Sequence, residues 1–278
     1  MDSPGIGNLF WIFLMIVSLQ PILRQKLIES ARLRLIANIE KLRKSRVITI
    51  VHRQESMSLL GFPVMRFISM EDSEEVLRAL EATSPDEDID LVIHTPGGLA
   101  LAALQIARAI TRRKGKVRVI VPHYAMSGGT LIALAADEIL MSENAVLGPV
   151  DPQLGEFPAP SLKALLEKKN INEIDDKTII YADIAQKAIA QMQEALVEIL
   201  TKNYGQEQAR KLSELLTRGE WTHDYPITPD KAKALGLKVN TQLPKEFLQL
   251  MSLYQQPVRR MRTVEYLPAE KSSHRGEF

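Results

Sequence analysis

The chain has 278 residues, of which 45% are hydrophobic and 25% charged, so it is long enough to bury one sizeable core. A net charge of +1 argues against a protein that binds nucleic acid through a strongly basic surface. The absence of cysteine excludes disulfides, thiolate metal sites and cysteine nucleophiles.

The N-terminal segment 1–23 is apolar. It carries no charge from Ser3 to Leu23 and contains the run LFWIFLMIVSL, so we predict a single-pass transmembrane helix that contacts membrane lipid. A basic juxtamembrane helix is expected over 24–46, and by the positive-inside rule it keeps the rest of the chain in the cytoplasm. A buried N-terminal helix, or an amphipathic helix lying on a membrane, is the alternative for 1–23.

From residue 47 onward, strands and helices are expected to alternate. Continuous apolar runs predict strands, and the runs between them have apolar residues at helical spacing. The predicted strands cover 47–53, 90–95, 116–122 and 138–141, and the predicted helices cover 73–82 (with Ser73 as its N-cap), 99–114 and 130–136. This order is typical of βαβ units, so we predict an α/β fold with a parallel sheet.

The second half of the chain is predicted to be mostly helical. The expected helices cover 161–169, 182–204, 206–217 and 229–235. The long helix over 182–204 has apolar side chains along one face, which suits an interface between copies of the chain. From residue 255 onward the chain is poor in apolar side chains, so we expect a flexible tail over 255–278 and a catalytic domain over 47–254.

Two predicted strand-to-helix turns contain paired glycines, in the stretches HTPGG and AMSGG. Ligands gather at the carboxyl ends of parallel strands, and glycine there exposes backbone N–H groups at close range. The amides of Gly98 and Gly128 are therefore candidate oxyanion donors, with Ser127 as the group that reacts. Each turn alone is also ordinary turn chemistry, in which Ser127 caps the following helix. A phosphate-binding loop is excluded because no Lys-Ser or Lys-Thr pair follows the glycines.

Together the two turns resemble the S-P-G-G and A-x-S-x-G pair of the Clp-type serine peptidases, with Ser127 lying 29 residues after Gly98. That superfamily includes the proteolytic subunit of Clp protease and signal peptide peptidase A. The chain is most similar to the serine dehydrogenase proteinase branch, over roughly residues 47–239. The resemblance implies a Clp/crotonase-like ββα spiral, a homo-oligomer, Ser127 as nucleophile, and Gly98 and Gly128 as oxyanion donors.

The general base departs from the Clp pattern. In the Clp subunit a histidine follows the serine by about two dozen residues, but this region reads LGPVDPQLG here. The signal-peptide-peptidase branch uses a lysine six residues before an aspartate, and Lys177 stands in that relation to Asp183. Apolar neighbours of Lys177 predict a partly buried amine, which suits a lysine base. We therefore predict a Ser127–Lys177 dyad, with Lys187 as the alternative base. Two further candidates are Lys168 and Lys169.

The remaining polar candidates are predicted to be structural. His223 lies far along the chain from Ser127, and we expect a structural histidine with its hydrogen bonds satisfied, although the order of triad residues along a chain is free. His94 is expected to brace the first glycine turn, and His123 and Asp151 to play supporting roles. No cluster has the spacing of metal ligands, so we expect neither a metal nor a cofactor.

The predicted function is thus a membrane-anchored serine endopeptidase that cleaves peptides through an acyl-enzyme. One alternative is a crotonase-type acyl-CoA enzyme, which uses similar amide donors and needs a carboxylate base beside them. A second alternative is a membrane scaffold of the same fold that has lost its chemistry. Loss of peptide cleavage in Ser127→Ala and Lys177→Ala distinguishes the three.

Overall fold

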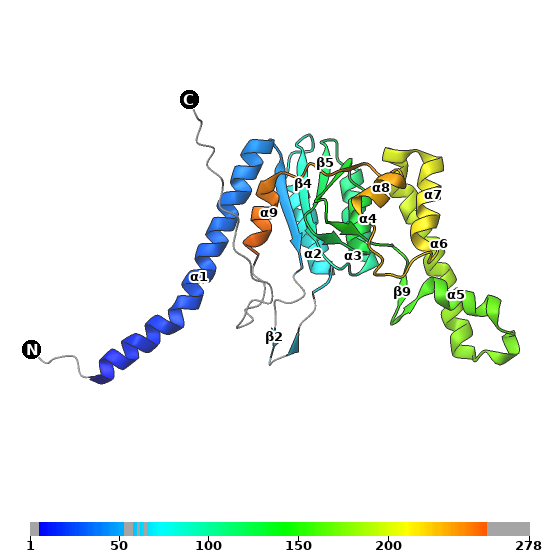
Figure 1. Cartoon of the computed structure of the whole chain (residues 1–278), viewed down its shortest axis with the longest axis horizontal. Coiled ribbons are helices and arrows are strands. Elements are labelled where there is room, and N and C mark those ends of the chain that lie inside the picture. Colours follow the sequence, from blue (N-terminus) through cyan, green and yellow to red (C-terminus); the bar gives the residue numbers. More distant parts are fainter. Residues whose placement is uncertain (1–5, 53–57, 60–61, 64–65, 255–278) are drawn as a thin grey trace, which may run out of the picture.

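The centre of the protein is a five-stranded sheet, as Figure 1 shows for the computed structural model, which describes residues 6–52, 58–59, 62–63 and 66–254. Its strand order is β1-β4-β5-β7-β11, and all four neighbouring pairs are parallel. These strands are β1 (Arg46–Val51), β4 (Ile89–His94), β5 (Val117–Val121), β7 (Glu138–Met141) and β11 (Val239–Asn240). The α/β class and the parallel sheet are therefore confirmed.

Helices cover both faces of this sheet. Alternate residues of a strand point to opposite faces, so an apolar run such as Leu91–Val92–Ile93 serves two cores. One core packs against α2 (Met70–Glu81), α3 (Ala100–Thr111), α4 (Gly128–Leu134), α6 (Asp176–Tyr204), α7 (Gln206–Thr217) and α8 (Pro229–Ala234). The other packs against α1 (Ile6–Arg43) and α9 (Lys245–Ser252), which lie side by side in Figure 1.

Short strands surround the carboxyl ends of the main sheet. They are β2 (Ser58–Leu59), β3 (Phe62–Pro63), β6 (Tyr124–Ala125), β8 (Val146–Leu147), β9 (Gln153–Leu154) and β10 (Phe157–Pro158). The parallel pair β6–β8 continues at both edges through single bridges, from Ala125 to Thr95 and from Leu147 to Ile227. This small second layer joins the two glycine turns to the loop before α8.

An arm extends from the domain, formed by α5 (Ala159–Lys168), the 3-10 turn η1 (Ile171–Glu173) and the first turns of α6, residues 159–187 (Figure 1). Few of its apolar side chains are buried: Ala159, Leu162 and Ala185 form a small cluster of their own. Larger side chains, among them Ile180 and Ile184, are exposed. The arm therefore depends on the main core much less than the rest of the domain does.

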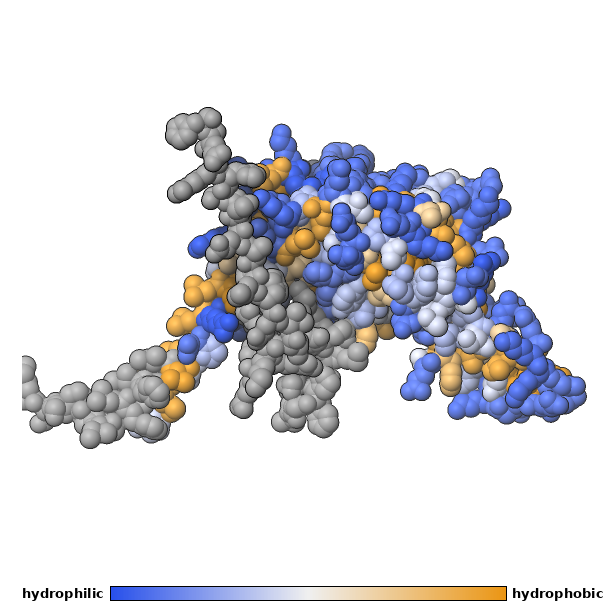
Figure 2. All heavy atoms as spheres, viewed as in Figure 1, coloured by the Kyte–Doolittle hydropathy of each residue, from blue (hydrophilic) through white to orange (hydrophobic). Residues whose placement is uncertain are grey.

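The N-terminal region differs from the sequence prediction. Residues 6–43, which come from both predicted segments, form one helix, α1, and Figure 2 shows apolar residues along its projecting part. Within the described part of the chain, no helix combines the length and apolar character that crossing a membrane requires. The predicted transmembrane helix is therefore not supported, and the cytoplasmic location of the domain stays a prediction.

Two helix starts were mispredicted for local reasons, and one helix was missed. Helix α2 begins after Ser69, whose hydroxyl accepts from the Asp72 amide while Asp72 accepts from the Ser69 amide, so the N-cap is Ser69 and Ser73 is buried inside the helix. Helix α6 begins after Asp175, which caps the Thr178 amide, so this helix starts earlier than predicted. Helix α9 was not predicted, and the predicted tail over 255–278 lies outside the described residues.

Strand β4 is held at its start by a buried charge network. The Asp90 carboxylate is fully buried and accepts hydrogen bonds from Arg43 at the end of α1, from Arg118 on β5 and from Ser45. Burial raises the pKa of Asp90, but the bonds from the two guanidinium groups and Ser45 outweigh it and hold the pKa below its usual range. The network fixes the strand that leads into the first glycine turn.

Candidate active site

Ser127 has a strained backbone at the turn from β6 into α4. Its φ of 48° and ψ of −114° lie outside the regions that residues with a side chain ordinarily adopt. Such a conformation costs about 1–3 kcal/mol and is typical of functional sites. Although Ser127 occupies the N-cap position of α4, its side chain makes no capping hydrogen bond. A capping role therefore does not explain the serine.

The glycines after Ser127 let this turn pack tightly against the rest of the site. The Gly129 amide donates to the Met126 carbonyl at 2.7 Å, which closes the turn. A Cβ at Gly129 would lie 2.6 Å from the Thr95 methyl group, closer than real contacts allow. Gly128 is the first residue of α4, so its N–H has no partner within the helix. Close packing thus requires glycine at position 129, and the turn leaves the Gly128 amide available.

The Gly97–Gly98 turn runs beside Ile68 as a short piece of parallel sheet. The Ile68 amide donates to the Gly97 carbonyl at 2.7 Å, and the Leu99 amide donates to the Ile68 carbonyl at 2.8 Å. In a parallel bridge of this kind, the amide and carbonyl of the middle residue, Gly98, face away from the partner strand. A Cβ at Gly98 would lie 2.3 Å from the Ile68 backbone, so only glycine fits.

The two glycine turns lie against each other. A Cβ at Gly128 would be 3.5 Å from the Gly98 nitrogen, and a Cβ at Gly97 would be 2.8 Å from the Ser127 Cβ. The Gly98 and Gly128 amides are therefore neighbours, with the serine beside them. The structure brings together all three residues that the sequence assigned to the nucleophile and the oxyanion hole.

Thr95 fixes the geometry of the first turn. Its buried hydroxyl accepts from the Gly97 amide at 3.2 Å and lies 2.9 Å from Nδ1 of His52. His52 in turn contacts the carboxylate of Asp72 at 3.4 Å. Burial raises the pKa of Asp72, but hydrogen bonds from Ser69 and the charge of His52 outweigh it, so the pKa is lowered. Side chains from three elements thus support the turn from behind.

A cleft of about 490 Å³ opens in front of both turns. Residues from four further parts of the chain complete its walls. These include Phe67 before α2, Val150 to Leu154 around β9, Ala188 and Met192 on α6, and His223 in the loop before α8. Ser127, Gly98 and Gly128 line the same cleft, so a bound molecule has access to all three.

Asp151 and His223 form a hydrogen-bonded pair inside this cleft. Nδ1 of His223 lies 2.8 Å from Oδ1 of Asp151, and the side-chain amide of Gln153 donates to Oδ2 of Asp151 at 2.6 Å. The Asp151 side chain is 1% exposed, whereas that of His223 is 32% exposed. The buried carboxylate thus lies behind a partly open imidazole. From the sequence, both residues were predicted to be structural, and no contact between them was predicted.

A model of the ClpP-like SDH-type serine proteinase family matches residues 2–277. The chain belongs to this family. Uncharacterized protein MJ0137 of Methanocaldococcus jannaschii is 53% identical over 268 residues, which cover 96% of this chain and 94% of that protein. Uncharacterized protein MJ1495 of the same organism is 48% identical over 277 residues, 100% of this chain and 94% of that protein.

A solved structure of a ClpP1 mutant from Listeria monocytogenes is also similar to the chain. It has a TM-score of 0.47 and 20% sequence identity, and the match covers 75% of this chain and 98% of that chain. Membership of the ClpP-like SDH-type serine proteinase family identifies the chain as a serine peptidase. The predicted superfamily and enzyme class are therefore confirmed.

In this serine proteinase the predicted lysine bases lie on the arm. Lys177 is an exposed residue in the first turn of α6, its ammonium 5.8 Å from the ring centre of Tyr181. Lys187 is exposed and paired with Asp183 at 2.5 Å. Neither residue lines the cleft that contains Ser127, and neither do Lys168 or Lys169. The expectation of a partly buried Lys177 is wrong for the single chain, because its apolar neighbour Ile180 is itself 59% exposed.

The other predicted supporting residues of the serine proteinase lie behind the turns. His94 is buried, with its ring centre 4.2 Å from that of Tyr124 and 5.5 Å from that of His123. None of these three rings lines the cleft that contains Ser127. Among the residues that the structure describes, no group of three His, Cys, Asp or Glu side chains is placed to hold a metal ion.

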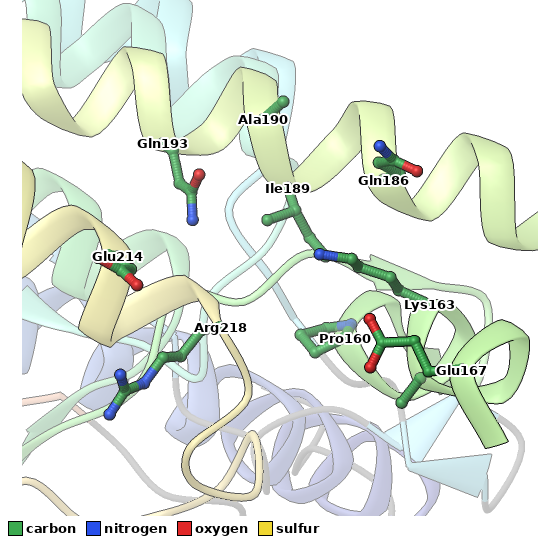
Figure 3. Close-up of a pocket in the computed structure, with 10 residues that line it drawn as sticks. Pro160, Lys163, Glu167, Gln186, Ile189, Ala190, Gln193, Glu214 and Arg218 are labelled. Atoms are coloured by element: carbon green, nitrogen blue, oxygen red, sulfur yellow. The ribbon is translucent and has the colours of Figure 1, made fainter.

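A second hollow, of about 450 Å³, lies between α5, α6 and α7. Figure 3 shows several of its polar lining residues, among them Lys163 and Glu167 on α5, Gln193 on α6 and Arg218 at the end of α7. Neither glycine turn lines this hollow. It is therefore separate from the cleft that contains the serine.

Proposed function

We propose that this serine peptidase cleaves peptide bonds with Ser127 as the nucleophile and the amides of Gly98 and Gly128 as oxyanion donors. The observation that carries the proposal is the strained backbone of Ser127, in a cleft, beside a second glycine turn. A strained strand-to-helix turn presents a serine hydroxyl to the substrate in unrelated hydrolases as well. Removing one oxyanion donor typically lowers kcat by about 100- to 1000-fold.

The substrate is proposed to bind as an extended strand along the Gly97–Gly98 turn. The N–H and C=O of Gly98 face away from Ile68, and Gly98 lines the cleft, so a peptide backbone has both a donor and an acceptor to pair with. This pairing places a substrate carbonyl next to Ser127. Attack then forms the acyl-enzyme, which water hydrolyses.

A crotonase-type acyl-CoA activity is not favoured by this cleft. Such an enzyme needs a free carboxylate base beside the amide donors. Asp151 is the carboxylate lining the cleft, and its oxygens are bonded to His223 and Gln153. A buried carboxylate with both oxygens paired is poorly placed to abstract a proton from a substrate.

Assembly of several copies is part of the proposal. The arm exposes large apolar side chains, which are typical of an interface; Ile171, Ile180 and Ile184 are examples. The predicted Ser127–Lys177 dyad also requires assembly, because a neighbouring copy would have to bring Lys177 to the cleft. Sedimentation of the full chain tests this part of the proposal, and a strictly monomeric active protein would contradict it.

The test of the nucleophile uses the full chain, a fluorogenic peptide mixture and a fluorophosphonate probe that acylates activated serines. We expect Ser127→Ala to lose peptide cleavage and probe labelling together, while its unfolding transition stays cooperative. Ser161→Ala, which alters an exposed serine of α5, is the matched control and should behave as wild type. Undiminished cleavage by Ser127→Ala would overturn the assignment.

A further inference from the structure

We infer that the buried imidazole of His52 is a positioning residue for peptide cleavage, because it holds Thr95 in the rotamer that keeps the Gly98 amide next to Ser127. The inference rests on the proposed roles of Ser127 and Gly98. His52 directly follows β1, is 5% exposed and does not line the cleft. It therefore acts on the reaction only through its neighbours.

Thr95 is the residue at which the two glycine turns meet. Its hydroxyl accepts from the Gly97 amide of the first turn at 3.2 Å. Its methyl group lies so close to Gly129, in the second turn, that a Cβ there would be 2.6 Å away. Its carbonyl accepts from the amide of Met126, the residue before Ser127, at 3.0 Å. The orientation of one buried side chain thus affects both turns.

His52 fixes that orientation. Threonine carries its hydroxyl and its methyl group on the same carbon, so a change of rotamer moves both groups. Nδ1 of His52 lies 2.9 Å from the Thr95 hydroxyl. This contact selects the rotamer in which the hydroxyl faces Gly97 and the methyl group faces Gly129. Loss of the imidazole would remove the selection.

Asp72 sets the tautomer of the ring. Nε2 of His52 lies 3.4 Å from Oδ1 of Asp72. A carboxylate only accepts hydrogen bonds, so in the neutral ring Nε2 carries the proton and Nδ1 is an acceptor. The Thr95 hydroxyl then donates to Nδ1 while its oxygen accepts from the Gly97 amide. The Gly97 carbonyl, 3.3 Å from this hydroxyl, already accepts from the Ile68 amide at 2.7 Å.

The ring also connects to the strand segment that pairs with the first turn. Asp72 accepts from the amide and the hydroxyl of Ser69, at 2.8 and 2.7 Å. Ser69 follows Ile68, which forms the parallel bridge with Gly98. His52 is therefore linked to both sides of this bridge, so it controls how the turn and the Ile68 segment lie against each other.

The main sheet fixes the position from which the ring projects. The His52 amide donates to the His94 carbonyl at 2.7 Å, which extends the pairing of β1 with β4. A misplacement of about 1 Å at a reacting centre can cost about 100-fold in rate, and loss of a whole oxyanion donor costs about 100- to 1000-fold. A displaced Gly98 amide should therefore cost about 10- to 100-fold.

The first test compares two substitutions in the full chain, each of which keeps one contact of the ring. The side-chain amide of Asn takes the place of Nδ1, and that of Gln takes the place of Nε2. We expect His52→Asn to keep kcat/KM within about threefold of wild type, because Thr95 retains its partner. His52→Gln loses that partner and should lower kcat/KM by about 10- to 100-fold. Equal kcat/KM in the two folded variants would overturn the inference.

Inhibition by a peptide aldehyde separates positioning from a loss of structure. The adduct of an aldehyde with the proposed nucleophile is tetrahedral, so its affinity reports the oxyanion donors. In His52→Gln the inhibition constant should rise by the factor by which kcat/KM falls. Thr49→Val is the matched control: on the same strand but the other face of the sheet, it removes a hydroxyl bonded to Tyr254. It should lower the unfolding midpoint and leave both constants unchanged.

A double substitution tests whether His52 acts through Thr95. Thr95→Val keeps the shape of the side chain but has no hydroxyl for the ring to orient. Added to Thr95→Val, His52→Gln should therefore lower kcat/KM by less than about threefold, although alone it lowers kcat/KM by about tenfold or more. Fully additive losses, or an aldehyde inhibition constant that stays at the wild-type value in His52→Gln, would contradict the inference.

The outcomes also distinguish this inference from the proposed function. If His52→Gln keeps wild-type kcat/KM while Ser127→Ala is inactive, the inference alone fails. If Ser127→Ala keeps wild-type cleavage, the proposed function fails and the inference fails with it. An inactive Ser127→Ala, together with an impaired His52→Gln and a nearly unaffected His52→Asn, supports both.

Discussion

Ser127 lies in a glycine turn and Lys177 lies on the arm. The two residues of the dyad predicted from the sequence are therefore fixed by the fold to different degrees. The turns are packed so closely that Cβ atoms at Gly98 and Gly129 would overlap neighbouring atoms. The arm holds Lys177 and Lys187 on exposed turns of α6. The core of one chain fixes Ser127 in the cleft, whereas a lysine on the arm would reach a cleft only through assembly of several copies. Motif spacing does not distinguish these two situations.

If the turns are fixed by packing, Gly98→Ala should have the largest effect. The added methyl group would lie 2.3 Å from the Ile68 backbone, at a φ of 155° that alanine rarely adopts. We expect kcat for peptide cleavage to fall by about 100-fold or more, because the proposed oxyanion donor is displaced. The measurement is a steady-state assay with an unfolding curve for the same sample.

Gly155→Ala is the matched control for that substitution. Gly155 also has a positive φ, of 65°, but nothing lies within 4 Å of its added Cβ. If Gly98→Ala keeps activity close to wild type, the first glycine turn can move. Packing would then not distinguish the glycine turns from the arm.

Asp90→Asn should give the next largest effect, at the start of the strand that leads to the first turn. Two guanidinium groups would lose their buried counter-charge, and breaking a buried ion pair costs about 3–5 kcal/mol. Urea unfolding measures the loss, and Asp86→Asn, at an exposed position on the preceding turn, is the control.

A lower pH should reduce the difference in unfolding free energy between wild type and Asp90→Asn. The folded-state pKa of Asp90 is lowered, so its stabilisation is complete above the unfolded value of about 3.9 and is lost as the pH falls further. The gap in unfolding free energy between wild type and Asp90→Asn should therefore narrow from about pH 7 to about pH 3. A gap that widens in acid would contradict the assigned network.

Thr95→Val should have a smaller effect, confined to the first turn. The variant keeps the shape but removes the oxygen that accepts from the Gly97 amide and contacts His52, which costs about 1–3 kcal/mol. We expect kcat to fall together with the free energy of unfolding. Gly98, whose amide is the proposed oxyanion donor, is the residue directly after Gly97. Thr111→Val, whose hydroxyl bonds only a carbonyl of its own helix, should change neither quantity appreciably.

Lys187→Ala should have the smallest effect on stability. Its ion pair with Asp183 is exposed on the arm, and such helix pairs contribute about 0.3–0.5 kcal/mol. Thermal unfolding at low and high salt measures the change, with Lys211→Ala on α7, an equally exposed pair, as control. A loss of several degrees that depends on protein concentration would instead place the arm inside an interface between copies.

Much of the sheet could be predicted because its strands are continuous apolar runs, and β4 is buried along its whole length. The glycine turns could be predicted as well, since glycine at those positions reflects local packing. The start of α2 could not, because Ser69 and Ser73 are both plausible caps and the capping box with Asp72 decides between them.

The pairing of Asp151 with His223 could not be predicted from local pattern either. The two residues meet through long-range backbone contacts, such as the bridge between Leu147 and Ile227, which leave no periodicity in either segment. One signal is present in the sequence: Asp151 falls in the stretch LGPVDPQLG, where the Clp pattern has a histidine. The prediction there concerned an imidazole only, and not a carboxylate that binds a histidine from elsewhere in the chain.

The backbone of Ser127 has an evolutionary consequence. Glycine adopts a φ of 48° and a ψ of −114° without the steric conflict that serine suffers there. At this position, selection for stability and selection for the proposed nucleophile therefore favour different residues. A descendant protein that no longer needed to cleave peptides would become more stable if glycine replaced Ser127. Retention of serine across a lineage is therefore a record of continued use.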